Sequence, residues 1–434
     1  MKTVLAHTNR LARGGLRRFG GSALLVALGR LAFLAFFAVA ARFSSVTQFG
    51  EFATSLALAQ ILAIAATLGT APAAQAILPA AMGRRNGRLA DIFIRFSLTM
   101  TLLATLGFGL VLLLIGIAAD QLDIPGGLGT MTLGACYLLP GIAFGTLREF
   151  LARSTGHTTL ALLPRDVVWT VACMAALIAS PTFGDNLVVG CAVLLATIEV
   201  GATAILLRRL GRWPLRKAPL RFFKQWRRRS LALMLNNTGG LLLDRFDIFI
   251  VGLLFPLDAA AVYSVANRLA PLASLSQRFV VPVQIAKISL AMARRDVTQV
   301  WLEVRTGLLA GAAFTLCVLL LFSFGNQPIL GLYGDHYLQA AQILLILSVG
   351  QSATALGSNF GMVASIGHRK WTFAIIIWLV VLPGGLLAYM AGLWFGMMGV
   401  AIAAAVTLIT YNFALAQVAR ITLADLGNSP AGSP

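Results

Sequence analysis

The stretch Ala81-Met82-Gly83-Arg84-Arg85 recurs 210 residues later as Ala291-Met292-Ala293-Arg294-Arg295. A second pair of matching stretches, Ser154-Thr155-Gly156-His157 and Ser365-Ile366-Gly367-His368, is separated by 211 residues. Two matches in the same order and at nearly the same offset indicate a duplicated unit of about half the chain. In a membrane protein, such a duplication is typical of a transporter whose site lies where the two halves meet.

Apolar stretches of about 20 residues recur along the whole chain, which is the helix length needed to cross a bilayer core of about 30 Å. Hydrophobic residues make up 59% of the 434 residues, charged residues make up 11%, and the mean hydropathy is +0.86. Soluble domains carry about 25% charged residues. No segment between the apolar stretches is long enough to form a soluble domain. The sequence therefore predicts an all-α polytopic membrane protein.

The apolar stretches predict about twelve membrane-spanning helices. We expect them at residues 20–42, 51–79, 91–117, 128–149, 158–179, 187–207, 231–255, 260–289, 303–325, 337–364, 371–392 and 396–419. Basic residues fall in alternate connections, so the positive-inside rule places both termini in the cytoplasm. The net charge of +19 is explained by this topology and does not indicate a nucleic-acid partner. With six helices each, the two halves enter the membrane from the same side, which makes the repeat parallel.

Four segments follow from this topology. Residues 1–207 form an N-terminal six-helix lobe and residues 231–420 form a C-terminal six-helix lobe. Residues 208–230 form a basic cytoplasmic linker with ten Lys or Arg residues and no acid. Positive-inside charge explains most of this linker, and an interfacial helix on anionic lipid is the alternative. Residues 421–434 are expected to form a disordered cytoplasmic tail.

Several charged and polar residues lie inside the predicted helices, where a charge costs about 2.5–3.5 kcal/mol on the insertion scale and usually faces a cavity or a partner. The spacing of Asn237, Gly240, Asp244 and Asp247 predicts one polar face on the seventh helix. The candidate residues for binding a substrate in a central cavity are Arg30, Gln60, Asp244, Asp247, Arg268 and Arg278. The alternative is structural, since the Asp244 or Asp247 carboxylate would then only neutralise Arg268 or Arg278.

Arg84, Arg85, Arg294 and Arg295 are candidates for a cytoplasmic gate, because they recur at equivalent places in the two halves. The alternative is that they anchor the cytoplasmic loops. No Gly-rich phosphate loop precedes a Lys-Ser or Lys-Thr pair, and no His or Cys cluster has the spacing of metal ligands. The sequence therefore predicts neither an ATPase nor a metal site, and the protein is not expected to be an enzyme.

Several stretches resemble a known family. Gln48-Phe49-Gly50-Glu51-Phe52 is similar to a turn that follows the first helix of that family. The run Asp244–Gly252, followed by Ala261-Val262-Tyr263 and Asn267-Arg268-Leu269, is similar to the family's seventh and eighth helices, and the exit of the tenth helix at Ala364–Arg369 also fits. The chain resembles the multidrug/oligosaccharidyl-lipid/polysaccharide exporter superfamily. Within it, the pattern resembles bacterial flippases for O-antigen, a part of lipopolysaccharide, and for exopolysaccharide.

The resemblance implies a V-shaped pair of six-helix lobes around a cavity that opens alternately to each side of the bacterial inner membrane. It implies that a polyprenyl-diphosphate-linked oligosaccharide moves from the cytoplasmic to the periplasmic leaflet. Arg30, Arg268 and Arg278 would neutralise the diphosphate, whose desolvation is costly. No cofactor is expected. An ion gradient or the membrane potential would supply energy, with Asp244 or Asp247 as the ion-responsive carboxylate. Expected partners are membrane lipids and the polymerase and glycosyltransferases of the same pathway.

Three alternatives stay open at this point. The first is a drug/cation antiporter of the same superfamily, which would favour a cavity of acids and aromatic residues. The second is a flippase for the lipid-linked precursor of peptidoglycan, which carries the same diphosphate chemistry. The third is a membrane polymerase or ligase, and the short extracytoplasmic loops argue against it.

Overall fold

The computed structural model describes residues 25–83, 87–122, 127–211, 220–366 and 370–428. Arg84, Arg85 and the residues beyond 428 lie outside these ranges. Within them, the chain forms helices and no strand. The all-α membrane fold predicted from the sequence is therefore confirmed.

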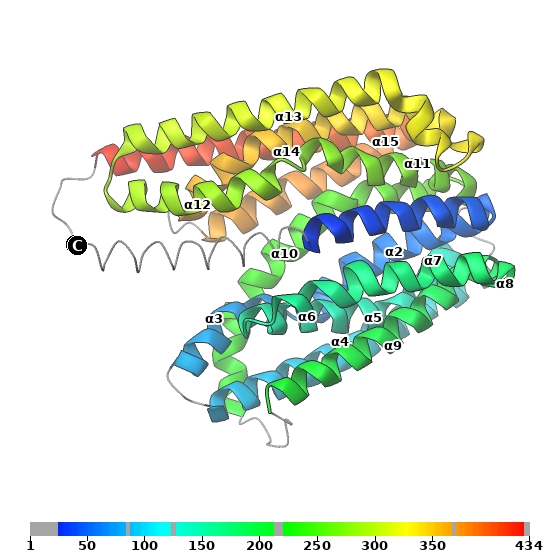
Figure 1. Cartoon of the computed structure of the whole chain (residues 1–434), viewed down its shortest axis with the longest axis horizontal. Coiled ribbons are helices and arrows are strands. Elements are labelled where there is room, and N and C mark those ends of the chain that lie inside the picture. Colours follow the sequence, from blue (N-terminus) through cyan, green and yellow to red (C-terminus); the bar gives the residue numbers. More distant parts are fainter. Residues whose placement is uncertain (1–24, 84–86, 123–126, 212–219, 367–369, 429–434) are drawn as a thin grey trace, which may run out of the picture.

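The first half of the chain folds into one group of helices, shown in blue to green in Figure 1. Its helices are Leu25–Phe43, α2 (Val46–Ala66), α3 (Thr70–Gly83), α4 (Gly87–Gln121), α5 (Leu128–Ser154), α6 (Thr158–Leu163), the π-helix η1 (Pro164–Trp169), α7 (Thr170–Ala179), α8 (Pro181–Asp185) and α9 (Leu187–Arg209). We call this group the N-lobe.

The second half forms the C-lobe, shown in green to red in Figure 1. Its helices are α10 (Leu220–Leu254), α11 (Leu257–Leu269), the 3-10 helix η2 (Ala270–Ser274), α12 (Gln277–Ala293), α13 (Val297–Gly331), the 3-10 helix η3 (Asp335–Ala340), α14 (Ala341–Ile366) and α15 (Lys370–Asn428).

Nine helices in the described ranges are long and apolar enough to cross a membrane. One of them, α15, contains two predicted spans, joined across Gly396, whose φ is 64°. The seventh and eighth predicted spans are present as helices that do not meet this criterion, for local reasons. α10 carries three charged residues in its span, Asp244, Arg245 and Asp247, and η2 divides the eighth predicted span into two short helices. Each of the predicted spans therefore coincides with helical structure.

The duplication is visible in the lengths and interruptions of the helices. α4 and α13 each contain 35 residues and begin 210 residues apart. The second span of each lobe is also interrupted, between α2 and α3 in the N-lobe and at η2 in the C-lobe. Leu68 and Gly69, with φ of 48° and 72°, end α2, while Pro271 lies in η2 and lacks the N–H that would continue a helix. The two breaks thus have different local causes.

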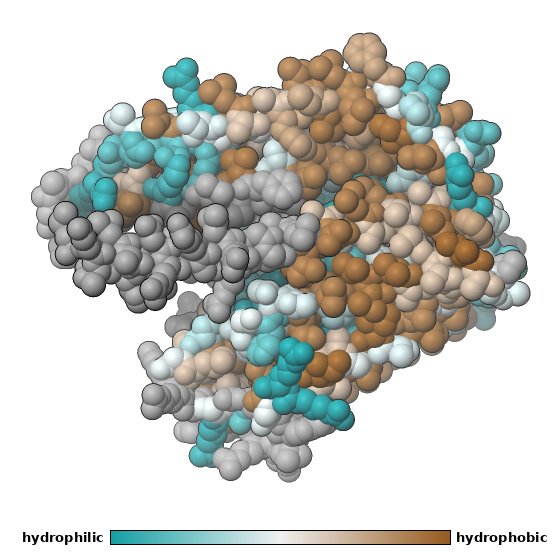
Figure 2. All heavy atoms as spheres, viewed as in Figure 1, coloured by the Kyte–Doolittle hydropathy of each residue, from teal (hydrophilic) through white to brown (hydrophobic). Residues whose placement is uncertain are grey.

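The lobes lie side by side at one end of the molecule and diverge at the other (Figure 1). At the closed end, Phe49 of α2 contacts Tyr337 of η3 with ring centroids 5.8 Å apart, and Phe37 contacts Phe49 at 5.6 Å. The surface is hollowed between the lobes toward the other end (Figure 2). The turn at Arg294 and Arg295 lies at this open end, where the sequence predicts the cytoplasm.

Two predicted boundaries differ from the structure. α10 begins at Leu220, inside the stretch 208–230 expected to be a linker. α15 continues to Asn428, so residues 421–428 of the tail expected to be disordered are helical. They are helical because Thr422 and Leu423 are buried, and Leu423 packs in a C-lobe cluster with Val418 and Ala419. Residues 429–434 lie outside the described ranges.

Candidate functional site

Two adjoining cavities of about 250 Å³ and 340 Å³ lie between the lobes. The C-lobe part is lined by α10, α11, η2 and α14, and the N-lobe part by α2, α5 and η1. The two parts share residues of the first helix, α10 and α11, namely Arg30, Phe33, Leu241, Arg245 and Arg268. We call them together the central cavity.

Arg268, in the last turn of α11, reaches the junction of the two parts. Its guanidinium carbon lies 4.7 Å from the ring centroid of Phe37 and 5.3 Å from that of Phe33, as in cation–π contacts. The residue is 6% exposed, and its Nε and one terminal nitrogen have no hydrogen-bond partner in the described part of the chain. Because buried donors without partners are costly, these nitrogens are suited to hold an anion.

Two further guanidinium groups line the same junction. Arg30 of the first helix is exposed to the cavity and has no ion pair or hydrogen bond among the residues described. Arg245 of α10 donates a 3.0 Å hydrogen bond to Oδ1 of Asn267, and its Nε has no partner in the same ranges. The site therefore combines three cations from three helices, two of which the sequence analysis had singled out.

The two acids of α10 lie in different surroundings. Asp244 is exposed on the cavity wall. Asp247 is 4% exposed and faces α11, where its Oδ2 accepts hydrogen bonds from the Tyr263 hydroxyl (2.9 Å) and from Nδ2 of Asn267 (2.6 Å). The prediction that both acids share one polar face of the cavity is therefore wrong for Asp247. Asp244 and Asp247 are three positions apart, so their side chains point in directions about 60° apart around the helix axis. This difference is enough to place Asp244 on the cavity wall and Asp247 against α11.

The remaining predicted residues divide into three groups. Gln60 of α2 lines the N-lobe part of the cavity, and its Oε1 is buried without a hydrogen-bond partner in the described ranges. Arg294 and Arg295 are exposed in the turn between α12 and α13 and line neither cavity. The side chain of Arg278 and all of Arg84 and Arg85 lie outside the described residues.

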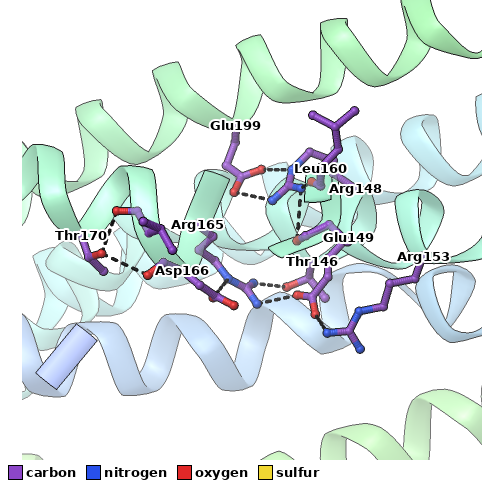
Figure 3. A network of polar contacts seen from close by, with 11 residues as sticks. Thr146, Arg148, Glu149, Arg153, Leu160, Arg165, Asp166, Thr170 and Glu199 are labelled. Atoms are coloured by element: carbon purple, nitrogen blue, oxygen red, sulfur yellow. Dashed lines mark hydrogen bonds and ion pairs between the residues drawn. The ribbon is translucent and has the colours of Figure 1, made fainter. Parts of the chain in front are cut away.

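A charged network in the N-lobe was missed as a site by the sequence analysis (Figure 3). Arg165 of η1 donates a 2.6 Å hydrogen bond to Glu149 of α5, and Arg153 contacts the other carboxylate oxygen of Glu149 at 2.5 Å. Asp166 follows Arg165 in η1 and is 37% exposed. All four line the N-lobe part of the cavity. The signal in the sequence that could have found it is the pair of adjacent charges Arg165-Asp166 inside an apolar span.

A buried ion pair lies behind this network. Nε and one terminal nitrogen of Arg148 donate to the carboxylate of Glu199, at 2.5 Å and 3.0 Å, and both residues are buried. The other terminal nitrogen donates to the carbonyl groups of Leu160 and Ala161. Pro164 has no N–H to bond the Leu160 carbonyl four residues earlier, so Arg148 supplies the missing donor. The pair therefore stabilises the π-helix that carries Arg165 and Asp166.

Comparison with solved structures places this fold among membrane transporters. No protein family and no curated protein matches the sequence. A multidrug-resistance MATE-family transporter of the MOP superfamily, in an inward-facing conformation, aligns with a TM-score of 0.65 and 16% identity over 94% of this chain and 100% of that one. The chain has the fold of these transporters.

Two further structures have the same fold. The lipid II flippase MurJ, in an inward closed conformation, aligns with a TM-score of 0.68 and 14% identity over 94% of this chain and 89% of that one. A mutant of the Vibrio cholerae MATE transporter VcmN aligns with a TM-score of 0.58 and 17% identity over 94% and 97%. The three similar structures are those of two transporters and a flippase.

Proposed function

We propose that this protein moves a polyprenyl-diphosphate-linked oligosaccharide from the cytoplasmic to the periplasmic leaflet of the bacterial inner membrane, in the biosynthesis of a polysaccharide. The observation that carries this proposal is the convergence of Arg30, Arg245 and Arg268 on one cavity, with two guanidinium nitrogens of Arg268 unpartnered among the described residues. A diphosphate offers several anionic oxygens to such a cluster.

The charge balance favours an anion over a neutral or cationic substrate at this junction. A guanidinium group matches phosphate oxygens with two parallel hydrogen bonds, which are shorter and stronger when both groups are charged. Cations held at membrane depth are costly when they are unpaired. A diphosphate that enters the cavity would therefore pair with the guanidinium groups. This pairing reduces the free-energy cost of holding the anion and the cations away from water.

Alternating access is supported by the shape of the molecule. The cavity lies between lobes that are in contact at one end and separated at the other, where the basic loops predict the cytoplasm (Figures 1 and 2). The lipid tail would stay in the bilayer while the diphosphate and sugars cross through the cavity. The similarity to a structure described as a lipid II flippase supports this class of substrate. We propose that the Asp244 carboxylate, which is exposed on the cavity wall, responds to a coupling ion. The proposed partners are the enzymes of the pathway that make or polymerise the oligosaccharide.

The proposal is tested by transport in proteoliposomes of the purified full-length protein. The probe is a polyprenyl diphosphate linked to a fluorescent oligosaccharide, and transport is read as loss of protection from a membrane-impermeant quencher. Arg268→Gln removes the charge and is expected to abolish transport, while Arg268→Lys keeps the charge without the paired geometry and retains part of it. Arg420→Gln changes an exposed arginine outside the cavity and serves as the matched control. Transport by Arg268→Gln at the wild-type rate would refute the proposal.

A drug/cation antiporter is the second candidate. Three carboxylates, those of Glu149, Asp166 and Asp244, line the same cavity, and acids bind organic cations. This candidate predicts uptake of tetraphenylphosphonium by the same proteoliposomes and its loss in Asp244→Asn.

A flippase for the peptidoglycan precursor has the same diphosphate chemistry, and the two flippases are distinguished by comparing transport of lipid II with transport of the oligosaccharide-linked probe.

A further inference from the structure

We propose that the N-lobe part of the cavity binds the sugar hydroxyl groups of the substrate, next to the arginine cluster that binds its diphosphate. This inference rests on the proposed function and assigns the two chemical parts of one substrate to two subsites. The sugar subsite is formed by Gln60, Glu149, Arg153, Arg165 and Asp166, which all line this part of the cavity.

The charges of this subsite are paired, unlike those of the arginine cluster. Glu149 accepts from Arg165 at 2.6 Å and from Arg153 at 2.5 Å, and the guanidinium of Arg165 also donates to the Thr146 hydroxyl at 3.3 Å (Figure 3). Paired charges carry little net field but still present many donors and acceptors at fixed positions. Such a wall suits a neutral ligand with many hydroxyl groups better than a phosphate.

Two groups in the subsite have hydrogen-bonding capacity left. Oε1 of Gln60 is buried without a partner among the described residues, which is costly unless a ligand or water donates to it. The carboxylate of Asp166 approaches Nε of Arg165 only at 3.8 Å and is 37% exposed to the cavity. A sugar hydroxyl can donate to either group, and the unoccupied lone pairs of both would accept it.

The subsite is held in place before a ligand arrives. The Cβ of Asp166 packs against Gly29 of the first helix, where an added Cβ would approach it to 2.7 Å. Arg148, paired with Glu199, bonds the Leu160 carbonyl that Pro164 leaves free, and so fixes the turn that begins η1. A preorganised wall lowers the entropy lost on binding and increases discrimination between ligands.

The two subsites meet at the correct place for one substrate. Arg30 lines both parts of the cavity. Asp166 packs against Gly29, the residue that precedes Arg30 in the first helix. A diphosphate held by Arg30 and Arg268 would therefore place the first sugar beside Asp166. The sugar and the diphosphate are covalently adjacent in a polyprenyl-diphosphate-linked oligosaccharide, in agreement with this arrangement.

The test measures binding of two kinds of probe to the purified full-length protein. One is farnesyl diphosphate, and the others are farnesyl diphosphates linked to glucose, galactose or N-acetylglucosamine. We expect at least one sugar-linked probe to bind about tenfold or more tightly than farnesyl diphosphate, because a buried site that bonds hydroxyl groups discriminates against a ligand without them. Asp166→Ala and Gln60→Leu should each remove this gain without weakening the binding of farnesyl diphosphate.

Matched controls use the same substitutions outside the cavity. Asp185→Ala and Gln339→Leu change exposed residues near the closed end and should keep the gain. Arg148→Lys should lose the gain through the turn at η1, and size-exclusion profiles show whether each variant folds. The inference is wrong if no sugar-linked probe binds more tightly than farnesyl diphosphate, or if Asp166→Ala and Gln60→Leu weaken both probes equally. Failure of the proposed function is a different result, in which Arg268→Gln leaves the affinity for farnesyl diphosphate unchanged.

Discussion

The Thr47 hydroxyl donates a 2.6 Å hydrogen bond to Oδ1 of Asp258, and these residues are 211 positions apart, the offset of the sequence repeat. Thr47 lies in the first turn of α2 and Asp258 in the first turn of α11. Gly50 packs against the backbone of Leu257 and Ala261 in the same contact. The closed end of the cavity is thus formed by equivalent turns of the two halves, and a transporter that opens this end must separate them.

Linking Thr47 and Asp258 covalently should stop transport. In a double variant, Thr47→Cys with Asp258→Cys, a short bis-methanethiosulfonate reagent would hold the lobes together at this end, and the opposite state could not form. We expect transport to fall to the background of empty liposomes and to recover when a reductant cleaves the link. Each single-cysteine variant, treated in the same way, is the control for modification of the native Cys136 and Cys317. Transport by the linked protein at the rate of the reduced one would show that this end does not open.

A side chain at position 50 should shift the equilibrium between the two states. The Cβ of Gly50→Ala would meet the carbonyl oxygen of Leu257, a backbone atom that cannot rotate away. Overpacking of this kind costs about 1–3 kcal/mol, and here the cost falls only on the state in which this end is closed. Labelling of a cysteine at position 47 by a membrane-impermeant maleimide should therefore be about tenfold faster in Gly50→Ala. Gly107→Ala, where an added Cβ meets nothing within 4 Å, should leave the labelling rate unchanged.

The fold was predictable from the sequence to a greater extent than the site. Apolar length and the 210-residue offset are properties of short stretches, so the spans and the equivalence of α4 and α13 could be deduced without contacts. The prolines at 72 and 79 indicate that the second span can break, but the position of the break at Leu68 could not be deduced, because a leucine with positive φ gives no local signal. Arg268 and Arg30 were predicted because a single charge in an apolar helix is conspicuous.

The orientation of each helix about its axis was the missing information. Asp247 has the right spacing for a cavity residue, but α10 is rotated so that it faces Tyr263. Glu199 and Arg148 lie 51 residues apart on α9 and α5, and only the packing of these helices brings them together. Arg245 lies about 100° from Asp244 around the helix axis and so falls off the predicted polar face, but the cavity face of α10 includes both residues.

Breaking the Arg148–Glu199 pair should destabilise the N-lobe. Glu199→Gln leaves a buried guanidinium without its counter-ion, and removing one partner of a buried pair costs about 3–5 kcal/mol of the free energy of unfolding. The loss is measured by thermal or denaturant unfolding in detergent. Arg153→Gln removes a 43% exposed partner of Glu149 and should cost less than about 1 kcal/mol. Equal losses in the two variants would contradict the structural role assigned to the buried pair.

Tyr333 should make the protein less stable at high pH. This residue lies between α13 and η3, outside the spans, and burial raises the pKa of its hydroxyl to about 12. Above pH 10 the unfolded chain releases this proton and the folded chain keeps it, so the unfolded state is favoured as pH rises. Between pH 10 and 12 the free energy of unfolding should fall by up to about 1.4 kcal/mol per pH unit from this group. Tyr333→Phe should have a shallower decline over the same range, and identical slopes for the two proteins would contradict the prediction.

The two acids of α10 should have separable roles. Asp244 is exposed in the cavity, so Asp244→Asn is expected to change the dependence of transport on pH or on sodium while the protein stays folded. Asp247 accepts two hydrogen bonds from α11 on one carboxylate oxygen, so Asp247→Leu, which leaves two buried donors without their acceptor, should lower the free energy of unfolding by about 1–3 kcal/mol. Transport in proteoliposomes under imposed proton or sodium gradients, together with unfolding in detergent, measures both effects. If neither variant changed the pH or sodium dependence, ion coupling through these carboxylates would be excluded. The remaining source of energy would then be the membrane potential, which acts on the charges of the arginine cluster and its bound anion.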